Sequence, residues 1–332
     1  MKSTAGGWET DSVIEVLIVG AGPVGLACGI EAGRNDLSYV ILEKGCLANS
    51  IFHCPTNVRF FSTPELLEIG NIPFVIAEEK PTRQEILNYY RRVSDHYHLF
   101  IRFDERVEEI TSGNGSFQIF SSRRKYRARR VVLATGFYDN PNLLNIPGET
   151  LPKVSHYYTE PFSFYRRKVA VIGGKNSAAE AALDLYRHGA EVTLIHRGPE
   201  IGQSVKYWIR PDLINRINEG RIRAFFNTTV TRIDEQVIFI KNGNGVEQQL
   251  PNDFVFAMTG YHPDFEFMRR AGIEIDEANR KAHYDPHTFE TNVPGLYIAG
   301  VAAASKHGQN IFIENGREHV KKIIQHIKRT DS

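Results

Sequence analysis

A glycine-rich turn near the start of the chain limits its possible folds more than any other feature. The apolar run at residues 13–19 leads into Gly-Ala-Gly-Pro-Val-Gly at residues 20–25, and a helix-like stretch of small residues follows at 26–34. A second apolar run at residues 39–42 then ends in Glu43. This order is a βαβ unit with G-x-G-x-x-G at its first turn, which is typical of dinucleotide-binding folds.

Each residue of this turn has a physical role in such a site. Gly20 permits the tight turn, Gly22 lets the backbone approach a pyrophosphate, and Gly25 lets the helix pack closely on the strand. The helix N-terminus carries a partial positive charge that favours the pyrophosphate. Glu43 stands where a carboxylate accepts hydrogen bonds from ribose hydroxyl groups. The pattern therefore predicts a dinucleotide site in the N-terminal region.

A second, altered copy of the pattern occurs in the middle of the chain. The apolar run at residues 168–172 leads into Gly-Gly-Lys-Asn-Ser-Ala at 173–178, and a helix-like stretch and a strand-like run at 191–195 follow. Lys175 replaces the second glycine and Ala178 replaces the third. A cation at a helix N-terminus is unfavourable unless something negative lies beside it. Lys175 therefore indicates a bound anion, unless its side chain simply extends into solvent.

The second copy also lacks the acidic residue that ends the first. His196 and Arg197 occupy the place that corresponds to Glu43. A basic side chain there accommodates the 2′-phosphate of NADP, whereas an acid would repel it. We therefore predict that the second site prefers NADPH. If Arg197 is only a surface residue, the site takes NADH instead.

The same order of elements is repeated along the chain. After each βαβ unit come a hairpin-like stretch and an apolar strand that ends in Thr-Gly, at residues 135–136 and 259–260. A C-terminal apolar run ends at Gly300, and too few residues follow it to form a third domain. We predict an α/β fold of two Rossmann-like dinucleotide-binding domains, one of which is inserted into the other.

The expected domain boundaries follow from this repeat. Residues 1–152 are expected to form the first part of the N-terminal domain, residues 153–260 the inserted domain, and residues 261–332 the part that completes the first domain. The two crossings between the domains are expected near residues 151–158 and 261–264.

The combined motifs point to a family. G-x-G-x-x-G, Ala-Thr-Gly, a second nucleotide-binding unit and a final strand with Ala-Gly together resemble the thioredoxin-reductase-like flavoproteins over nearly the whole chain. The resemblance implies FAD in the N-terminal and C-terminal parts and NADPH in the insertion. Thioredoxin reductases carry C-x-x-C in the inserted domain. This chain has no cysteine after Cys54, which excludes that activity.

A narrower group matches more of the sequence. The bacillithiol disulfide reductases of the YpdA-like group are similar to this chain at residues 55–56, 60–63, 67–73, 154–158, 173–178 and 311–317. This resemblance implies an NADPH-dependent, FAD-containing oxidoreductase that reduces a low-molecular-weight thiol disulfide of the bacillithiol type. It also implies that a helix N-terminus at Ile311 faces the flavin pyrimidine, where N–H groups stabilise negative charge.

The chain departs from this group at one residue. Its members typically have a cysteine just before the third glycine of the first fingerprint, where this chain has Val24. Cys54 is the candidate catalytic residue in its place, because it precedes Pro55-Thr56 in a segment that the resemblance places near the flavin. Cys28 falls within the first helix and is interpreted as a buried structural thiol. A reactive thiol needs exposure and a low pKa, which the sequence does not reveal.

The two cofactors divide the candidate site residues into two sets. The residues expected to bind FAD are Gly20, Gly22, Pro23, Gly25, Glu43, Lys44, Pro55, Thr56, Thr135, Gly136, Gly300 and Ile311. The residues expected to bind NADPH are Gly173, Gly174, Lys175, Asn176, Ser177, Ala178, His196, Arg197, Thr259 and Gly260. Because the cofactors perform the hydride transfer, the chain requires no general acid or base for that step.

Other functions stay open. Flavin-dependent monooxygenases also pair two nucleotide-binding folds, and His156 precedes the second unit much as a histidine does in their motif. Their full F-x-G-x-x-x-H is absent from residues 150–156. An NADPH reductase for ferredoxin or flavodoxin would use a basic patch, part of which Arg166, Arg167 and Lys168 could supply. A redox-sensing binding module is the non-enzymatic alternative.

Composition bears on other classes of protein. The formal net charge of +1 gives no footprint for nucleic acid. The first ten residues lack the apolar core of a signal peptide, and glycines and a proline interrupt the longest apolar stretch, residues 16–30. The three cysteines match no zinc-site spacing and suit a reducing compartment. We therefore expect a cytoplasmic homo-oligomer with a small-molecule acceptor and with no metal, membrane or nucleic-acid partner.

Overall fold

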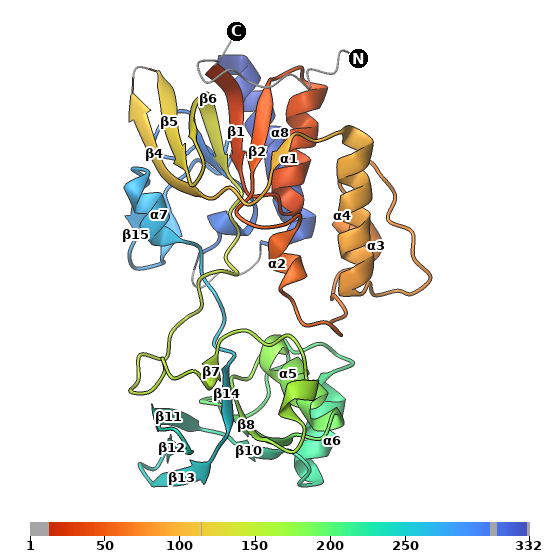
Figure 1. Ribbon diagram of the computed structural model, residues 1–332, viewed down its shortest axis with the longest axis vertical. Helices are drawn as coiled ribbons and strands as arrows, with labels where there is room; N and C mark the ends of the chain where they lie inside the picture. Colours follow the sequence, from red (N-terminus) through yellow and green to blue (C-terminus); the bar gives the residue numbers. More distant parts are fainter. Residues whose placement is uncertain (1–12, 114, 306–310, 331–332) are drawn as a thin grey trace. The chain divides into compact units, whose positions relative to one another are not determined.

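The computed structural model describes residues 13–113, 115–305 and 311–330, and the chain divides into two compact units (Figure 1). Unit 1 comprises Met1–His53, Arg59–Asn140 and His262–Ser332, and unit 2 comprises Cys54–Val58 and Pro141–Tyr261. Most of unit 2 is therefore carried as one insertion between two parts of unit 1.

The inserted unit takes in more of the chain than residues 153–260. Its main segment begins at Pro141, because the stretch that follows bonds to the strands of unit 2: the Asn142 N–H donates to the Gly260 carbonyl (2.9 Å). Its short segment, Cys54–Val58, joins through Thr56. The Thr56 N–H donates to the Thr159 carbonyl (3.0 Å), and its hydroxyl donates to the Glu160 carboxylate (3.1 Å).

Unit 1 is built on a sheet that has seven strands among its described residues, in the order β3-β2-β1-β6-β5-β4, with β17 also paired to β6. The strands are β1 (Val13–Val19), β2 (Tyr39–Leu42), β3 (Ile101–Arg102), β4 (Val107–Gly113), β5 (Ser116–Ser121), β6 (Lys125–Leu133) and β17 (Leu296–Ile298). The neighbours β3-β2-β1-β6-β17 run parallel, whereas β4 and β5 form an antiparallel meander with β6.

Helices cover both faces of this sheet. They are α1 (Pro23–Arg34), α2 (Asn49–Phe52), α3 (Pro64–Leu67), α4 (Arg83–Tyr97), α7 (Phe265–Arg270), the 3-10 turn η2 (Gly300–Ala303) and α8 (Ile313–Thr330), and a short hairpin joins β15 (Ile275–Asp276) to β16 (Lys281–Ala282). Strand β1 is apolar except for Glu15 near its start, because from Val16 onward it is buried on both faces. Val16 and Ile18 join the core formed with α1, α4 and α8, whereas Leu17 and Val19 join the core formed with α7.

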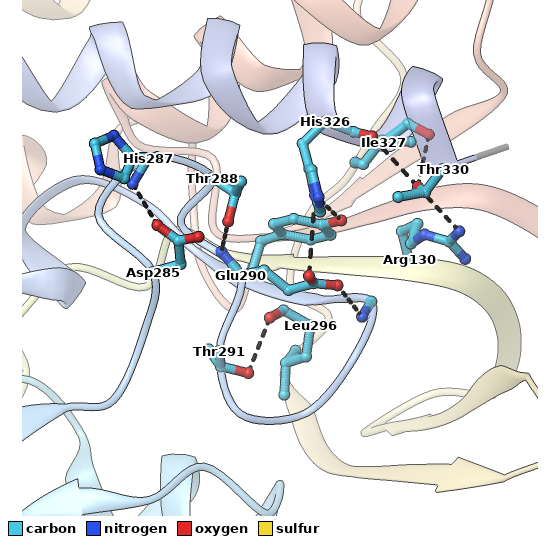
Figure 2. A network of polar contacts seen from close by, with 12 residues as sticks. Arg130, Asp285, His287, Thr288, Glu290, Thr291, Leu296, His326, Ile327 and Thr330 are labelled. Carbon is cyan, nitrogen blue, oxygen red and sulfur yellow. Dashed lines mark hydrogen bonds and ion pairs between the residues drawn. The ribbon is translucent and has the colours of Figure 1, made fainter. Parts of the chain in front are cut away.

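The C-terminal half of α8 is fixed to the sheet by a polar network, which Figure 2 shows. Tyr297 of β17 is fully buried, and its hydroxyl lies 3.0 Å from Nδ1 of His326 in α8. Glu290 lies 4.0 Å from the same ring nitrogen and accepts a hydrogen bond from the Gly295 N–H (2.7 Å). Because these contacts hold the end of α8 at the start of β17, the first turns of α8 lie near the other end of that strand, at Gly300.

Unit 2 repeats the parallel arrangement with fewer strands. Its described sheet runs β10-β9-β8-β14-β7, all parallel, beside an antiparallel sheet β11-β12-β13. The strands are β7 (Val154–Ser155), β8 (Lys168–Ile172), β9 (Glu191–Ile195), β10 (Arg223–Phe225), β11 (Thr228–Ile233), β12 (Val237–Asn242), β13 (Glu247–Pro251) and β14 (Phe254–Ala257). The helices are η1 (Phe162–Phe164), α5 (Asn176–Arg187) and α6 (Arg210–Asn218).

The order β2-β1-β6 in unit 1 matches β9-β8-β14 in unit 2, and antiparallel strands precede both β6 and β14. This repeat confirms the predicted α/β fold with two Rossmann-type domains. Among the described residues, no helix combines the length and the apolar character that crossing a bilayer requires.

Candidate functional site

Two of the three fingerprint glycines of unit 1 are required by packing. Gly20 follows β1 with a φ of +107°, and a Cβ there would lie 2.6 Å from the Ala134 carbonyl oxygen. A Cβ on Gly25 would lie 1.8 Å from the Gly20 carbonyl oxygen. A side chain at either position would collide with backbone, so these glycines allow α1 to start directly at the end of β1.

The remaining glycine of the fingerprint, Gly22, has a different environment. Gly22 is the N-cap of α1, with Pro23 at the first helical position, and a Cβ on Gly22 would meet no atom of the described residues within 4 Å. Packing within the protein therefore does not explain this glycine. The open space lies where the N–H groups of the first turn of α1 can receive an anion, which fits a pyrophosphate.

Glu43 ends β2 beside this turn and is nearly buried, with 5% of its surface exposed. One carboxylate oxygen accepts from the Ala21 N–H (2.8 Å) and the other from the Gly45 N–H (2.9 Å). Burial raises the pKa of Glu43, and these two hydrogen bonds oppose the shift. Each oxygen can accept a second hydrogen bond, so the carboxylate can still hold a ribose hydroxyl. The next residue, Lys44, forms an ion pair with Asp139 (2.6 Å).

A buried hydroxyl at the end of β6 completes this edge of the sheet. Oγ1 of Thr135 is buried and has no hydrogen-bond partner among the described residues. Gly136 follows with a φ of +71°. Buried hydroxyls are normally satisfied. A buried unsatisfied group beside a dinucleotide turn fits a site whose missing partner is the ligand, so the residues present are compatible with FAD.

The first turns of α1, η2 and α8 meet at Gly300, which has a φ of +65°. A Cβ on Gly300 would lie 2.9 Å from Cγ2 of Val24, and a Cβ on Gly316 would lie 2.9 Å from Cα of Gly300. The Gly300 N–H donates to Nδ1 of His319 (3.2 Å). Burial, followed by the charge of Lys322, lowers the pKa of His319 to about 4, so the ring stays neutral and can accept this bond. Val24 is thus a packing residue here.

The start of α8 is ordered by side chains. The Phe312 N–H donates to Oδ1 of Asn315 (2.7 Å), and Glu314 accepts from the Ser62 hydroxyl (2.8 Å). Ile311 is partly buried and packs against the core between the sheet and α7. The helix N-terminus that the resemblance placed at Ile311 therefore begins at Ile313.

The three cysteines differ in their capacity to react. Cys28 is fully buried, as the sequence indicated, and burial followed by the charge of Glu31 raises its pKa to about 12. Desolvation, followed by the charge of Glu43, also raises the pKa of Cys46, although that residue is exposed. Cys54 is partly exposed and belongs, with Pro55 and Thr56, to the short segment of unit 2.

The corresponding turn of unit 2 is more closed. Gly173 has a φ of +145°, and a Cβ there would lie 2.5 Å from the Met258 carbonyl oxygen. A Cβ on Gly174 would lie 2.4 to 2.5 Å from the ring of His196. His196 therefore fills the space beside this turn. Ala178, at the place of the third glycine, lies in the first turn of α5, is buried in the core of unit 2 and packs beside Gly173.

The residues at the start of α5 have unequal freedom. Lys175 is the N-cap of α5 and is exposed, and Ser177 is exposed as well. The Asn176 side chain is engaged by a later part of the chain. Its Oδ1 accepts from the Lys206 N–H (2.8 Å), and its amide donates to the Ser204 carbonyl (3.4 Å). Lys175 is thus the side chain of this turn whose charge can reach an approaching anion.

The two basic residues after β9 also divide their roles. Burial, followed by the charge of Arg197, lowers the pKa of His196, so this ring is neutral near pH 7. Arg197 is exposed. The cation available to a 2′-phosphate at this strand end is therefore Arg197.

The Thr-Gly pair that ends β14 is satisfied within unit 2. The Thr259 hydroxyl donates to the Asn142 carbonyl (2.5 Å), and the Asn142 amide donates to the Thr259 carbonyl (3.3 Å). Gly260 has a φ of +87°. The Thr259 side chain therefore holds the segment that starts at Pro141 against the end of β14.

His156, which entered the monooxygenase alternative, has structural partners inside unit 2. Its Nε2 lies 3.2 Å from the Glu149 carboxylate and its Nδ1 lies 3.2 Å from the Ala257 carbonyl. The ring is 12% exposed. These contacts assign it a packing role beside β14.

Two further residues have roles that the sequence did not indicate. His319 accepts from Gly300, and Lys206 is a buried lysine paired with Glu180. The neighbours of Lys206 give no consistent sign of its burial, because Val205 is buried whereas Tyr207 is exposed. Neither partner could be read from local spacing, because each lies far along the chain.

The sequence and structure also match known proteins. A model of the pyridine nucleotide-disulphide oxidoreductase family matches residues 17–300. Bacilliredoxin reductase Bdr of Bacillus subtilis is 40% identical over 319 residues, which cover 96% of this chain and 98% of that protein. Ferredoxin–NADP reductase 1 of Bacillus velezensis is 27% identical over 89% of this chain and 85% of its own length.

A solved structure agrees with these matches. The bacillithiol disulfide reductase Bdr (YpdA) from Staphylococcus aureus superposes with a TM-score of 0.94 at 40% identity, covering 97% of this chain and all of the other. The match extends through both units and both strand–helix turns. The protein described here therefore belongs to the pyridine nucleotide-disulphide oxidoreductase family, as a flavin oxidoreductase that uses FAD and NADPH and lacks a C-x-x-C pair.

Proposed function

We propose that this protein uses NADPH to reduce the disulfide of a low-molecular-weight thiol of the bacillithiol type. The observation that carries the proposal is the similarity over 97% of the chain to a structure named bacillithiol disulfide reductase. The overall reaction consumes NADPH, one proton and one disulfide, and it yields NADP⁺ and two thiols. When bound, FAD accepts the hydride of NADPH and passes two electrons on.

The first strand–helix turn is the proposed FAD site. Open space at Gly22 and the N–H groups that start α1 suit the pyrophosphate. The Glu43 carboxylate has acceptor capacity left for a ribose hydroxyl. The buried Thr135 hydroxyl is without a partner among the described residues and is ready to bond the cofactor. Gly300, beside the first turn of α8, completes the set within unit 1.

The second turn is the proposed NADPH site. Lys175 and Arg197 are both exposed cations, one at the start of α5 and the other at the end of β9. A pyrophosphate beside Lys175 would turn an unfavourable cation at a helix N-terminus into a favourable pair. Arg197 supplies the charge for the 2′-phosphate, because His196 beside it is neutral.

We propose Cys54 as the thiol that meets the disulfide. Cys28 is buried with a raised pKa, and Val24 is packed against Gly300. The Cys54 thiolate would attack one sulfur of the disulfide, forming a mixed disulfide and releasing one thiolate, which takes up a proton. Two electrons that originate from NADPH, with a second proton, would then release the other thiol and restore Cys54.

One experiment separates the possible acceptors. The FAD-loaded protein is reduced anaerobically with NADPH, and bacillithiol disulfide, oxidised ferredoxin or oxygen is then added separately while flavin absorbance is followed. We expect bacillithiol disulfide to reoxidise the flavin fastest, and Cys54→Ser to slow that reaction. If no thiol disulfide reoxidises the flavin and Cys54→Ser behaves like wild type, the proposed substrate class is wrong.

A second candidate acceptor is an acidic redox protein of the ferredoxin or flavodoxin type. The exposed residues Arg166, Arg167 and Lys168 favour it, because they form a basic stretch at the start of β8. Fast reoxidation by ferredoxin that slows as salt concentration rises would support this activity.

We also propose that the protein acts in the cytoplasm as a homo-oligomer. The three cysteines form no C-x-x-C motif, which suits a reducing compartment. Such a compartment also supplies NADPH. Light scattering after gel filtration of the FAD-loaded protein tests the assembly, and a monomeric mass at working concentration would contradict it.

A further inference from the structure

The segment that follows Arg197 is fastened to α5 at its far end. Residues 198–209 run from the end of β9 to the start of α6. Three side-chain contacts attach this segment to the first turns of α5, and we call them the clip. Asn176 accepts from the Lys206 N–H (2.8 Å) and donates to the Ser204 carbonyl (3.4 Å), and the Lys206 ammonium pairs with the Glu180 carboxylate.

The clip is built from buried charges. The Lys206 side chain is 7% exposed and that of Glu180 is 18% exposed. Burial raises the pKa of Glu180, and the charge of Lys206 and its hydrogen bond to Glu180 oppose that shift. The Lys206 ammonium also lies 5.7 Å from the centre of the Trp208 ring. Because Glu180 balances the charge of Lys206, the clip acts on the coenzyme site by holding residues 198–209 in place more than by supplying charge.

The other end of the segment is held independently of the clip. The Gly198 carbonyl accepts from the Asn227 N–H (2.8 Å). A Cβ on Gly198 would lie 2.6 Å from Nε2 of His196, so Gly198 packs on that ring. These contacts fix the segment next to Arg197, whereas the clip fixes it next to the N-terminus of α5.

We propose that Lys206 is a positioning residue of the NADPH site. Through the clip, it holds residues 198–209 beside the first turns of α5, where the pyrophosphate half of the coenzyme binds. This inference rests on the proposed function that places NADPH at this junction. The pyrophosphate is common to NADPH and NADH, so Lys206 acts on affinity for both coenzymes, while Arg197 determines the preference between them.

The physical reason is the cost of ordering a loop. A segment held in its binding conformation before the coenzyme arrives loses little conformational freedom on binding, whereas a released segment must be ordered at that moment. In Lys206→Met the ion pair is lost and Glu180 is left buried without it. We expect the dissociation constants of NADP⁺ and NAD⁺ to rise by the same factor of about ten, which corresponds to about 1.4 kcal/mol.

The test measures coenzyme binding apart from turnover. NADP⁺ and NAD⁺ are titrated by calorimetry into the FAD-loaded protein for wild type, Lys206→Met, Lys206→Arg and the exchanged pair Glu180→Lys/Lys206→Glu. The chain has two tryptophans, so in a Trp8→Phe background the emission of Trp208 reports the segment itself. Lys241→Met is the matched control, because Lys241 forms an exposed pair with Glu247 in the hairpin of β12 and β13.

The outcomes separate a positioning role from general damage. We expect Lys206→Met to weaken both coenzymes equally, to shift the Trp208 emission and to raise KM for NADPH without lowering kcat. Lys206→Arg is expected to bind like wild type, the exchanged pair to recover most of the affinity, and Lys241→Met to change nothing. If Lys206→Met does not fold, Glu180→Gln carries the same test, because it removes the charge while keeping the shape.

Two results would overturn the inference. Affinities of Lys206→Met within about twofold of wild type would show that the ion pair between Lys206 and Glu180 does not position the site. A selective loss of NADP⁺ affinity would make Lys206 a 2′-phosphate ligand instead. Arg197→Ala distinguishes these failures from failure of the proposed function: if it leaves both affinities and their ratio unchanged, Arg197 does not bind the 2′-phosphate and the assignment of NADPH to this junction loses its basis.

Discussion

The two units end a central strand with the same dipeptide and use it in opposite ways. Oγ1 of Thr135, after β6, is buried and has no partner among the described residues, whereas Oγ1 of Thr259, after β14, donates to the Asn142 carbonyl (2.5 Å). A shared Thr-Gly ending therefore does not imply a shared role. In unit 1 the hydroxyl can still bond to the proposed cofactor, whereas in unit 2 it is already bonded to the chain.

The turns that follow β1 in unit 1 and β8 in unit 2 also differ, and again the turn in unit 1 is the more open. Around Gly22 there is open space, whereas Gly174 is packed against the His196 ring. The first site ends in the buried Glu43, and the second ends in the exposed Arg197. A buried carboxylate and an unfilled buried hydroxyl suit a cofactor that stays bound, while exposed cations suit a coenzyme that exchanges. Four measurements test this difference between the two sites.

The largest effect is expected from Gly25→Ala. Its Cβ would lie 1.8 Å from the Gly20 carbonyl oxygen, and this overlap costs about 3 kcal/mol or more. The gain in helix propensity, about 1 kcal/mol, does not offset it. We expect a lower free energy of unfolding and protein purified without flavin absorbance. Gly22→Ala is the control, because its Cβ has space: stability should hold while FAD affinity falls. A yellow, stable Gly25→Ala protein would contradict the proposed turn.

Arg197→Ala tests the second site. Hydrogen bonds to charged groups contribute about 1.5–3 kcal/mol, so the ratio of kcat/KM for NADPH over NADH should fall by about 10-fold to 100-fold. Flavin content should not change. Arg221→Ala is a suitable control. Arg221 precedes β10 and so lies at the amino ends of the parallel strands, whereas Arg197 follows β9 and lies at their carboxyl ends. An unchanged ratio in Arg197→Ala would remove the basis for assigning NADPH to this turn.

The free energy of unfolding is expected to depend on pH through His319, which lies beside the first site. Burial lowers its pKa to about 4 in the folded protein, below its ordinary value of 6.5. Between these two values the unfolded chain binds a proton that the folded chain does not, so stability falls as pH decreases. We expect this residue to contribute about 1–2 kcal/mol to the loss between pH 7 and pH 5. Denaturant unfolding of wild type and His319→Gln at both pH values measures it. Equal losses in the two proteins would show that His319 is not held neutral.

The smallest effects come from the two threonines. Thr135→Val removes a hydroxyl that has no partner among the described residues, so apoprotein stability should hold while FAD binding weakens by about 1 kcal/mol. Thr259→Val breaks the bond to Asn142, so the free energy of unfolding should fall by about 1 kcal/mol. Urea unfolding and FAD titration of both variants give the comparison. If Thr135→Val destabilises the apoprotein as much as Thr259→Val does, the contrast between the strand ends is lost.

The sequence was sufficient for the repeated architecture because the signals for it are local. Continuous apolar runs indicate parallel strands buried on both faces, and Gly25 is required by a contact with the Gly20 carbonyl within the same turn. Gly20 is required locally by its positive φ, whereas its close contact with Ala134 is brought about by folding. The family followed from the same motifs. The start of the main segment of unit 2, at Pro141, was harder to predict. It depends on contacts with distant residues, such as the hydrogen bond from the Asn142 N–H to the Gly260 carbonyl.

The features of the two sites can likewise be separated into those set by neighbouring residues and those set by distant ones. From the sequence alone we could identify the two strand–helix turns that we propose as dinucleotide sites and see which of them is followed by an acid and which by a base. These features depend on residues that lie close together along the chain. The folded structure was needed to see that the Thr135 hydroxyl has no partner among the described residues while the Thr259 hydroxyl has one. It was also needed to see that His319 accepts from the Gly300 N–H and that Lys206 pairs with Glu180, 26 residues away. The free energy of a buried polar group depends on the partner that folding brings to it, and spacing along the chain does not encode that partner.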